Sequence, residues 1–197
     1  MNKLVLATNN RNKAAEIIEL LQELPVEILT LRNYPGLVMP EEDRPTFAGN
    51  AAKKAEAVAS YSGEMAMADD SGLEVDALNG RPGVRSARYA GEDKSDRDNN
   101  NLLLQELKNL PPAKRSACFK CAIAVAIPGD KTAIIEESCP GQIAEKPLGE
   151  NGFGYDPLFI YEPSGLTFAQ MSRAKKNKVS HRGKALRRVK ELLKELL

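Results

Sequence analysis

Asp69 and Asp70 are two adjacent carboxylates between apolar runs, within the segment Met65–Val75. We expect Met65–Ala68 and Leu73–Val75 to form short strands, and Ser71-Gly72 to turn the chain between them. Side chains alternate between the faces of a strand, so two neighbouring anions inside one strand would place a charge on a buried face. An acidic pair at a strand end is suited to hold a cation or accept a proton. A solvated turn is the alternative for Asp-Asp taken alone.

A polar loop, Thr8–Asn12, follows the predicted buried strand Leu4–Ala7 and precedes a helix predicted from Lys13 to Leu24. A helix that begins directly after a strand offers free backbone N–H groups and a positive dipole end to a phosphate. An ordinary polar capping loop has the same composition. The chain has no GxxxxGK[ST] or GxGxxG motif, so nucleotide binding here cannot depend on a P-loop.

Further carboxylates and lysines lie in the next predicted loop and helix. Glu41, Glu42 and Asp43 precede a helix predicted from Phe47 to Tyr61, with Thr46 as its N-cap and Ser62-Gly63 at its end. Lys53 and Lys54 are adjacent in this helix, about 100° apart, so one can face a site while the other is solvated. With Asp69 and Asp70, the acidic residues offer the oxygen ligands that Mg²⁺ takes from proteins.

A second group of candidate residues lies near the C-terminus. Gly152–Asp156 places Phe153, Tyr155 and Asp156 in a glycine-rich loop, where an aromatic ring can stack on a base and an acid can accept a hydrogen bond from it. Phe153 and Tyr155 could equally be core residues. Lys175, Lys176 and Lys178 precede Ser180-His-Arg-Gly183 at the start of the last predicted helix, and His181 is the only histidine.

The composition is that of a soluble globular protein of 197 residues with a net charge of +1. It gives no reason to expect a nucleic acid or a membrane as partner, although residues 173–197 carry ten Lys or Arg against two Glu. The N-terminus lacks the apolar region of a signal peptide, and three cysteines suit a reducing compartment, so we expect a cytoplasmic protein. Cys118 and Cys121 have CxxC spacing, but too few further ligands exist for a zinc site.

Alternating strands and helices, with a hairpin from Lys120 to Glu136 around Pro128-Gly-Asp130, predict an α/β fold with a mixed sheet. Ser95 and Asp98 have the spacing of a capping box and open a helix that Pro111-Pro112 stops. A strand is expected at Leu158–Tyr161. Leu186, Val189, Leu193 and Leu196 lie on one face of the last helix, which Ser180 caps.

Six ordered motifs between residues 3 and about 190 give the chain a specific resemblance. The motifs are Ala7-Thr8-x-Asn10-x-x-Lys13, Thr46-Phe-x-x-Asn50-Ala51-x-x-Lys54-Ala55, Ala68-Asp-Asp-Ser-Gly-Leu73, Pro82-Gly-Val-x-Ser-Ala-Arg-Tyr89, Gly152-Phe-Gly-Tyr-Asp-Pro157 and Ser180-His-Arg-Gly183. With them the chain resembles the inosine triphosphate pyrophosphatase family, the XTP/dITP diphosphatases. The resemblance implies a Mg²⁺-dependent enzyme that hydrolyses deaminated purine nucleotides such as ITP, dITP and XTP to the monophosphate and pyrophosphate.

The resemblance also implies an architecture and a role for each matching residue. Residues 1–197 would form a single domain of two lobes, with a long mixed sheet flanked by helices, an active-site cleft between the lobes, and a homodimer as the assembly. Glu41 and Asp70 would bind Mg²⁺, and Asp70 would accept the proton of the attacking water. The implied substrate-binding residues are Thr8, Asn9, Asn10, Arg11, Asn12, Lys13, Lys54 and Ser71 on the phosphate side, and Phe153, Gly154, Tyr155, Asp156, Lys176, His181 and Arg182, chiefly on the base side.

Three alternatives remain open at this point. Glu42 could replace Glu41 as the metal ligand, because Asp43-Arg-Pro45 differs from the usual residues of the family. The related septum-associated nucleotide pyrophosphatases act on other modified nucleotides, but the Ser-His-Arg and Phe-Gly-Tyr-Asp motifs favour the purine family. A nucleotide- or nucleic-acid-binding module that uses the basic C-terminus would bind without Mg²⁺-dependent turnover. The acidic pair argues against such a module, because it repels phosphates unless a metal intervenes.

Overall fold

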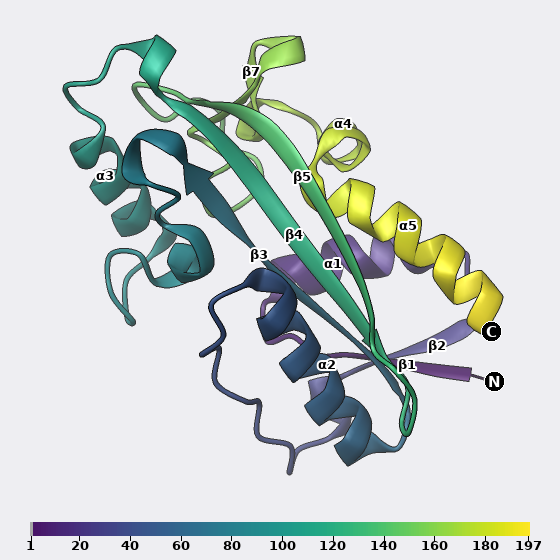
Figure 1. Ribbon diagram of the computed structural model, residues 1–197. Coiled ribbons are helices and arrows are strands. Elements are labelled where there is room, and N and C mark those ends of the chain that lie inside the picture. Colours follow the sequence, from purple (N-terminus) through teal and green to yellow (C-terminus); the bar gives the residue numbers. More distant parts are fainter. Residues whose placement is uncertain (1) are drawn as a thin grey trace. The chain divides into compact units, whose positions relative to one another are not determined.

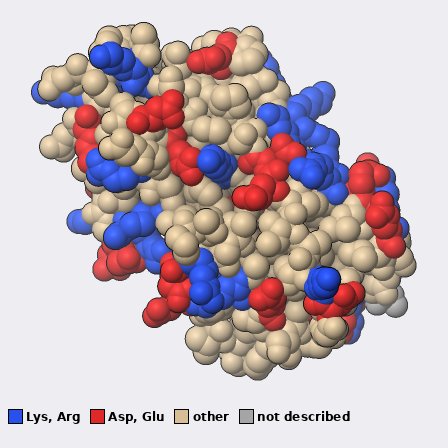
Figure 2. Space-filling view, viewed as in Figure 1, with Lys and Arg blue, Asp and Glu red and all other residues tan. Residues whose placement is uncertain are grey.

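The computed structural model describes residues 2–197, which divide into two compact units (Figure 1). Within the described residues, unit 1 comprises residues 2–70, 121–137 and 183–197, and unit 2 comprises residues 71–120 and 138–182. Each unit has its own apolar core. No helix within residues 2–197 has both the length and the apolar composition needed to cross a membrane. Lys, Arg, Asp and Glu side chains are interspersed on the face in Figure 2, as the small net charge predicts.

The described residues form one seven-stranded sheet with the order β2-β1-β3-β4-β5-β6-β7. Strand β1 is parallel to β2 and β3, whereas β6 is antiparallel to β5 and β7. The predicted α/β fold with a mixed sheet is therefore confirmed. The cleft between two lobes stays a prediction. The strands are β1 (Asn2–Leu6), β2 (Val26–Thr30), β3 (Met65–Val75), β4 (Ser116–Ala126), β5 (Ala133–Ile143), β6 (Phe159–Tyr161) and β7 (Leu166–Thr167).

Strand β3 corrects one of the sequence-based expectations. It is a single strand of 11 residues, and Asp69, Asp70 and Ser71-Gly72 lie within it instead of forming a turn between two short strands. Both carboxylates are buried, with exposed fractions of 1% and 6%. The strand continues because each carboxylate has a lysine partner inside the protein, which the local sequence does not reveal.

Unit 1 packs helices α1 (Arg11–Leu21), α2 (Phe47–Ser62) and most of α5 (His181–Leu196) against its strands. Ile17 and Leu21 of α1 and Leu186, Val189 and Leu193 of α5 share a core with Met67 of β3. Helix α2 lies in front of the strands in Figure 1, whereas α1 passes behind them. Small residues line the buried side of α2, where Ala51 and Ala55 are fully buried. The two faces of β3 are therefore covered by different helices.

Unit 2 contains helices α3 (Asp96–Glu106) and α4 (Arg173–Val179), several short 3-10 helices and an aromatic core. Phe119, Phe159 and Phe168 pack together, with ring centroids 4.6–5.8 Å apart. Helix α4, a seven-residue lysine-rich helix whose N-cap is Ser172, was not expected from the sequence pattern. Helix α5 begins at His181, so the predicted last helix is confirmed, although Leu196 at its end is 39% exposed.

Local capping signals account for several element boundaries. Thr46 caps α2 by accepting a hydrogen bond from the backbone N–H of Gly49, and Gly63 ends the helix with φ of +71°. Ser95 and Asp98 form the predicted capping box of α3, with Oγ of Ser95 3.2 Å from N of Asp98 and Oδ2 of Asp98 2.9 Å from N of Ser95. Helix α3 ends at Glu106, before the prolines expected to stop it.

Replacement of Ser95 by Ala should remove the two hydrogen bonds of its hydroxyl, one accepted from the backbone N–H of Asp98 and one donated to the Asp98 carboxylate, and keep the bond from the backbone N–H of residue 95. We expect unfolding free energy to fall by about 1 kcal/mol in urea denaturation. The backbone N–H and hydroxyl of Ser95 hold the pKa of Asp98 below its ordinary value, so NMR should detect a rise in that pKa in the variant. A carboxyl with a lowered folded pKa stabilises the protein above the unfolded pKa and loses this effect as pH falls through the folded value.

The loss of folding stability at low pH that Asp98 contributes should therefore be smaller in Ser95→Ala than in the wild type. Thr46→Ala is the matched control, because it removes an equivalent cap from α2 and leaves α3 untouched. An Asp98 pKa that is the same in Ser95→Ala and wild type would contradict the assignment of the capping box.

Candidate functional site

The acidic pair directs its two carboxylates to opposite faces of β3, because consecutive side chains of a strand alternate. Asp69 lies two residues after Met67 and therefore points to the same face, which α1 covers. Asp70 points to the other face, together with Ala66 and Ala68. Burial of two adjacent charges is tolerated only where partners compensate for the lost hydration. Two helices supply these partners, one on each face.

On the α1 face, Lys13 is the partner of Asp69. Its Nζ lies 2.5 Å from Oδ1 of Asp69, whose side chain is fully buried. The Sγ–H of Cys121 in β4 donates to Oδ2 of the same carboxylate at 3.1 Å. Cys118 is partly exposed and Cys121 buried, and all three cysteines are free thiols. Cys121 thus serves as a hydrogen-bond donor to Asp69.

On the α2 face, Lys54 and Asn50 hold Asp70. The Nζ of Lys54 lies 3.2 Å from Oδ1 of Asp70, and Nδ2 of Asn50 donates to Oδ2 at 3.2 Å. Lys54 also contacts Oε1 of Glu42 at 2.6 Å and donates to the backbone carbonyl of Asp69 at 3.0 Å. Lys53, the adjacent residue, instead contacts Asp43 at 2.8 Å on the exposed side, as the helical angle predicts.

Burial and neighbouring charges shift the pKa values of Asp70 and Lys54. Burial raises the pKa of the Asp70 carboxyl above its ordinary value, against the lowering influence of Lys54 and Lys13. For Lys54, burial acts to lower the pKa of the ammonium group, but Asp70 and Glu42 outweigh it and the pKa is raised. Lys54 therefore stays charged, and Asp70 is a better proton acceptor than an exposed aspartate.

The loop before α1 is organised by its own side chains. Asn10 caps α1, because its Oδ1 accepts from the backbone N–H groups of Asn12 and Lys13 at 3.0 and 3.1 Å. Thr8 Oγ1 accepts from the backbone N–H of Asn10 at 3.1 Å. Asn9, Arg11 and Asn12 are exposed. Asn10 and Thr8 thus shape the loop, and the exposed residues remain available to a ligand.

The donor set of this group suits a divalent cation. On the α2 face, Asp70 and Glu42 bring two carboxylates to the ammonium group of Lys54, which leaves these three side chains with net negative charge. Hard carboxylate oxygens are the ligands of Mg²⁺, which needs one or two of them beside phosphates and waters. Among residues 2–197, no group of three or more His, Cys, Asp or Glu side chains is arranged as a complete metal site. The protein would therefore supply part of the coordination only.

The structure brings Glu42, and not Glu41, to Lys54 and Asp70. Glu41 is exposed, and its backbone carbonyl accepts from Nζ of Lys53 at 2.9 Å. Glu42, the alternative that the sequence left open, is therefore the acid whose side chain contacts Lys54, the partner of Asp70.

In unit 2, the glycine-rich loop is held by an internal ion pair. Oδ2 of Asp156 accepts from Nζ of Lys176 at 2.6 Å and from the backbone N–H of Phe153 at 3.0 Å. Asp156 and Lys176 are both buried, with exposed fractions of 2% and 4%. The Nζ of Lys176 also lies 4.8 Å from the ring centroid of Phe153, within cation–π range. Tyr155 is buried in the core, whereas Phe153 remains partly exposed.

Arg182 and His181, the first two residues of α5, adjoin the same loop. The Cζ of Arg182 lies 5.5 Å from the Phe153 ring centroid, and its Nη2 donates to Oγ of Ser71 at 2.7 Å. His181 stacks on Phe119 with ring centroids 4.6 Å apart. In unit 2, Lys176 and Arg182 therefore lie near the partly exposed ring of Phe153, with Asp156 and Ser71 as their hydrogen-bond partners.

The predicted residues thus form two groups, one in each unit. Thr8–Lys13, Lys54 and Asp70 belong to unit 1, and Ser71, Phe153–Asp156, Lys176, His181 and Arg182 belong to unit 2. Sequence reasoning gave no role to Asn50 or Cys121. The spacing of Asn50 and Lys54, at i and i+4, was a usable signal, since it places both on one helix face. The bond from Cys121 to Asp69 had no signal in the local sequence.

Comparison with known proteins agrees with the motifs. The model of the Ham1 family matches residues 4–192. The chain is 51% identical to a dITP/XTP pyrophosphatase from Desulforamulus reducens, over 98% of this chain and 96% of that protein, and 48% identical to one from Geobacillus kaustophilus, over 100% and 97%. A solved structure of a HAM1 protein from Coxiella burnetii is 38% identical, with a TM-score of 0.91 over 99% of this chain and 100% of the other.

The match extends over nearly the full length of both this chain and its relatives, and it includes all the residues of the two groups. The chain therefore belongs to the Ham1 family.

Proposed function

We propose that this protein hydrolyses deaminated purine nucleoside triphosphates, namely dITP, XTP and ITP, to the nucleoside monophosphate and pyrophosphate. The observation that carries the proposal is the buried pair Asp69-Asp70 with a lysine on each face of β3. Such an arrangement fixes a carboxylate beside an ammonium group on each face of the strand, and a polyphosphate with its cation requires both signs of charge. The relatives named dITP/XTP pyrophosphatases support the reaction and the class of substrate.

In the proposed reaction, a water molecule attacks the α-phosphorus of the nucleotide. A new bond forms between the water oxygen and that phosphorus, the bond to the bridging α–β oxygen breaks, and pyrophosphate leaves. Asp70 accepts the proton of the water, a role that its raised pKa favours. Phosphoryl-type transfers need little covalent participation by the protein, so orientation and charge stabilisation supply most of the rate.

Lys13 and Lys54 neutralise negative charge on the phosphates. Both are anchored by carboxylates, so their ammonium groups need no large reorganisation during the reaction. Glu42 and Asp70 would hold Mg²⁺, which supplies charge neutralisation for the leaving pyrophosphate when bound. The exposed Asn9, Arg11 and Asn12 at the start of α1 complete the phosphate side, with the backbone N–H groups of that helix end.

The unit 2 group recognises the base in this proposal. Phe153 offers an aromatic face for stacking, and Arg182 donates to the 6-oxo group of hypoxanthine or xanthine. Adenine carries a 6-amino group at the same position. This group is a hydrogen-bond donor, as is the guanidinium of Arg182, so the two could not form a hydrogen bond. A site built to hydrogen-bond one group can reject the analogue that lacks it by about 10⁴-fold. Ser71, Lys176 and Asp156 hold Arg182 and Phe153 in place.

The cellular setting is part of the same proposal. Three free thiols suit the reducing conditions of the cytoplasm, where nucleotide pools are found. A homodimer is expected from the family resemblance.

Asp70→Asn should lower kcat for ITP at least about 100-fold, because it removes the proton acceptor and a metal ligand together. The measurement is release of monophosphate and pyrophosphate over a panel of ITP, dITP, XTP, GTP and ATP with Mg²⁺. Asp43→Asn changes an exposed acid that contacts Lys53 and should leave kcat near the wild-type value. If folded Asp70→Asn kept more than about a tenth of wild-type kcat, Asp70 would not be the proton acceptor.

The choice between Glu42 and Glu41 can be tested by the metal requirement. Glu42→Gln should raise the Mg²⁺ concentration for half-maximal activity by about tenfold, the loss of roughly 1.4 kcal/mol from one carboxylate ligand. Glu41→Gln, a matched change one residue earlier, should leave it unaltered. Direct Mn²⁺ binding, followed by electron paramagnetic resonance, provides a readout that does not depend on turnover. The reverse pattern in the two variants would restore Glu41 as the ligand.

Arg182→Ala should lower kcat/KM for ITP and XTP by about 2–3 kcal/mol, the loss of a charge-assisted hydrogen bond at a buried position. The kcat/KM for ATP should barely fall, so the preference for ITP over ATP should be lost because ITP becomes a poorer substrate. Arg182→Lys keeps the charge without the planar fork and should recover only part of the loss. An ITP/ATP ratio of kcat/KM that stays at the wild-type value in Arg182→Ala would place base selection elsewhere.

A further inference from the structure

The loop that carries Phe153 has little freedom to adjust from within. A Cβ added to Gly152, where φ is +78°, would lie 2.0 Å from Oδ2 of Asp156, the oxygen that binds Lys176 and the backbone N–H of Phe153. Gly154 has φ of +61°, with no atom within 4 Å of an added Cβ. Gly154 makes its contacts with α3 through its backbone N–H and carbonyl groups.

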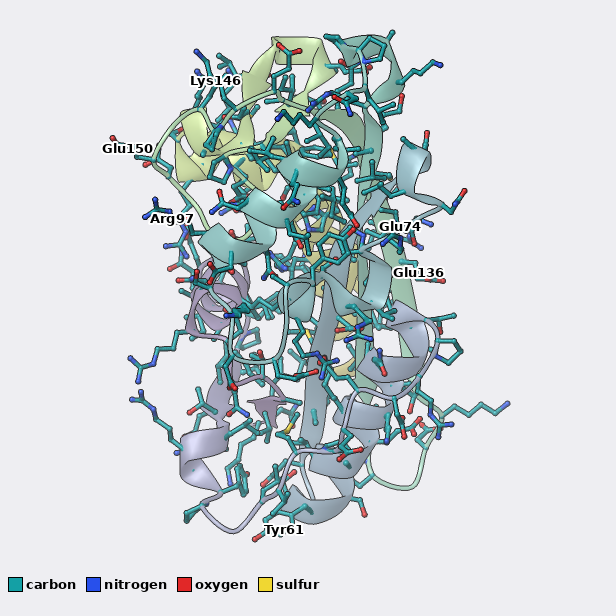
Figure 3. The ribbon with its side chains drawn as sticks, turned by 90° about the vertical axis from the view of Figure 1, so that its left-hand side faces the viewer. Tyr61, Glu74, Arg97, Glu136, Lys146 and Glu150 are labelled. Carbon is teal, nitrogen blue, oxygen red and sulfur yellow. The ribbon has the colours of Figure 1, made fainter. Side chains whose placement is uncertain are left out.

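Two residues of α3 hold the peptide groups on either side of the Gly154 Cα atom. Oδ2 of Asp96 accepts from the backbone N–H of Gly154 at 2.7 Å, and Nδ2 of Asn100 donates to its backbone carbonyl at 3.0 Å. Asp96 and Asn100 are four residues apart, so they lie on one face of the helix. Arg97, in the same turn, is exposed and points outward in Figure 3.

Asn100 is an unusual residue for the position it occupies. It is 8% exposed, and its Oδ1 is buried with no hydrogen-bond partner among the described residues. A buried amide with an unmade bond destabilises the fold relative to an apolar side chain of the same size. Its donation to Gly154 is the interaction that an apolar residue could not replace.

The neighbouring residue Asn99 connects α3 to a second element. Its side chain accepts from the backbone N–H of Ala90 at 2.7 Å and donates to the carbonyl of Ala87 at 3.1 Å, at the end of the 3-10 helix η3 (Gly83–Arg88). The hydroxyl of Tyr155 donates to the carbonyl of Ser86 in η3 at 2.9 Å. The segment Pro82–Tyr89 and the Phe153 loop are thus fixed to the same helix.

We infer that Asp96 and Asn100 are positioning residues for base selection, and that they act by fixing the Gly154 peptide groups and with them the Phe153 ring. This inference rests on the proposed function for the identity of the base. Neither side chain needs to touch the nucleotide. The pair sets where the ring lies relative to Arg182, and a loop released from α3 would stack on any purine without aligning its 6-position to the donor.

The test uses Phe153→Trp as a reporter, because the chain contains no tryptophan. In this background, Asn100→Asp replaces the amide donor by an isosteric acceptor, and Asp96→Ala removes the other contact. Asp96→Asn retains an acceptor oxygen and is the conservative variant. Asn101→Ala, an exposed amide on the same helix, is the control. Acrylamide quenching measures the freedom of the introduced indole ring, and its fluorescence also reports binding of IMP and AMP, independent of turnover.

We expect quenching to increase at least about twofold in Asn100→Asp and Asp96→Ala, and the preference for IMP over AMP to fall at least about threefold. Asp96→Asn and Asn101→Ala should match the reporter background in both measurements. Unchanged quenching in the first two variants would overturn the inference, and so would increased quenching with an unchanged IMP/AMP preference. Failure of the unsubstituted protein to hydrolyse ITP, dITP or XTP would overturn the proposed function instead, while the quenching and binding results would still decide the role of α3.

Discussion

The structure depends on the burial of two adjacent carboxylates inside one strand. Asp69 and Asp70 lose their hydration in β3, and this loss is tolerated because Lys13 and Lys54 compensate it on opposite faces. The alternation of the strand then dictates the layers around it, since each face needs a helix that delivers an ammonium group. Fully buried alanines at positions 51 and 55 let α2 approach closely enough for Lys54 to reach the strand. Removal of one partner would leave an uncompensated charge in the core.

The elements that were predicted well are those specified by local chemistry. Apolar periodicity predicted α1 and α5, capping residues predicted the starts of α2 and α3, and the mixed sheet followed from the order of strands and helices. The prediction of a turn at Ser71-Gly72 was wrong because β3 depends on distant residues. The charges that keep this strand continuous come from helices distant in sequence. Helix α4 escaped prediction because its lysines carry no apolar periodicity, and only Ser172 marks its start.

The candidate site shows the same division between local and distant information. Helical geometry predicted that only one of the two adjacent lysines faces inward, and the resemblance singled out Lys54, which binds Asp70 while Lys53 pairs with Asp43. The contact of Lys54 with Glu42, and not with Glu41, could not be predicted in this way, because it is set by the path of an irregular loop and by the reach of Lys54. Cys121 is a further case, since only the pairing of strands brings its thiol to Asp69.

The two groups differ in the charge that they present, and this difference gives each a distinct chemistry. In unit 1, Asp69 pairs with Lys13, and Asp70 and Glu42 pair with Lys54, so carboxylates outnumber ammonium groups and the group suits a cation. In the proposed function, this cation lets the group accept a polyphosphate. In unit 2, Arg182 donates to the neutral hydroxyl of Ser71 and lies against the ring of Phe153. A guanidinium ion has five N–H donors and no acceptor, so it can bind this hydroxyl and still donate to an oxo group. In the proposed function, the same buried arginine would gain nothing from a 6-amino group, so the chemistry of the residue and the rigidity of the loop beside it are our proposed basis for selection against adenine.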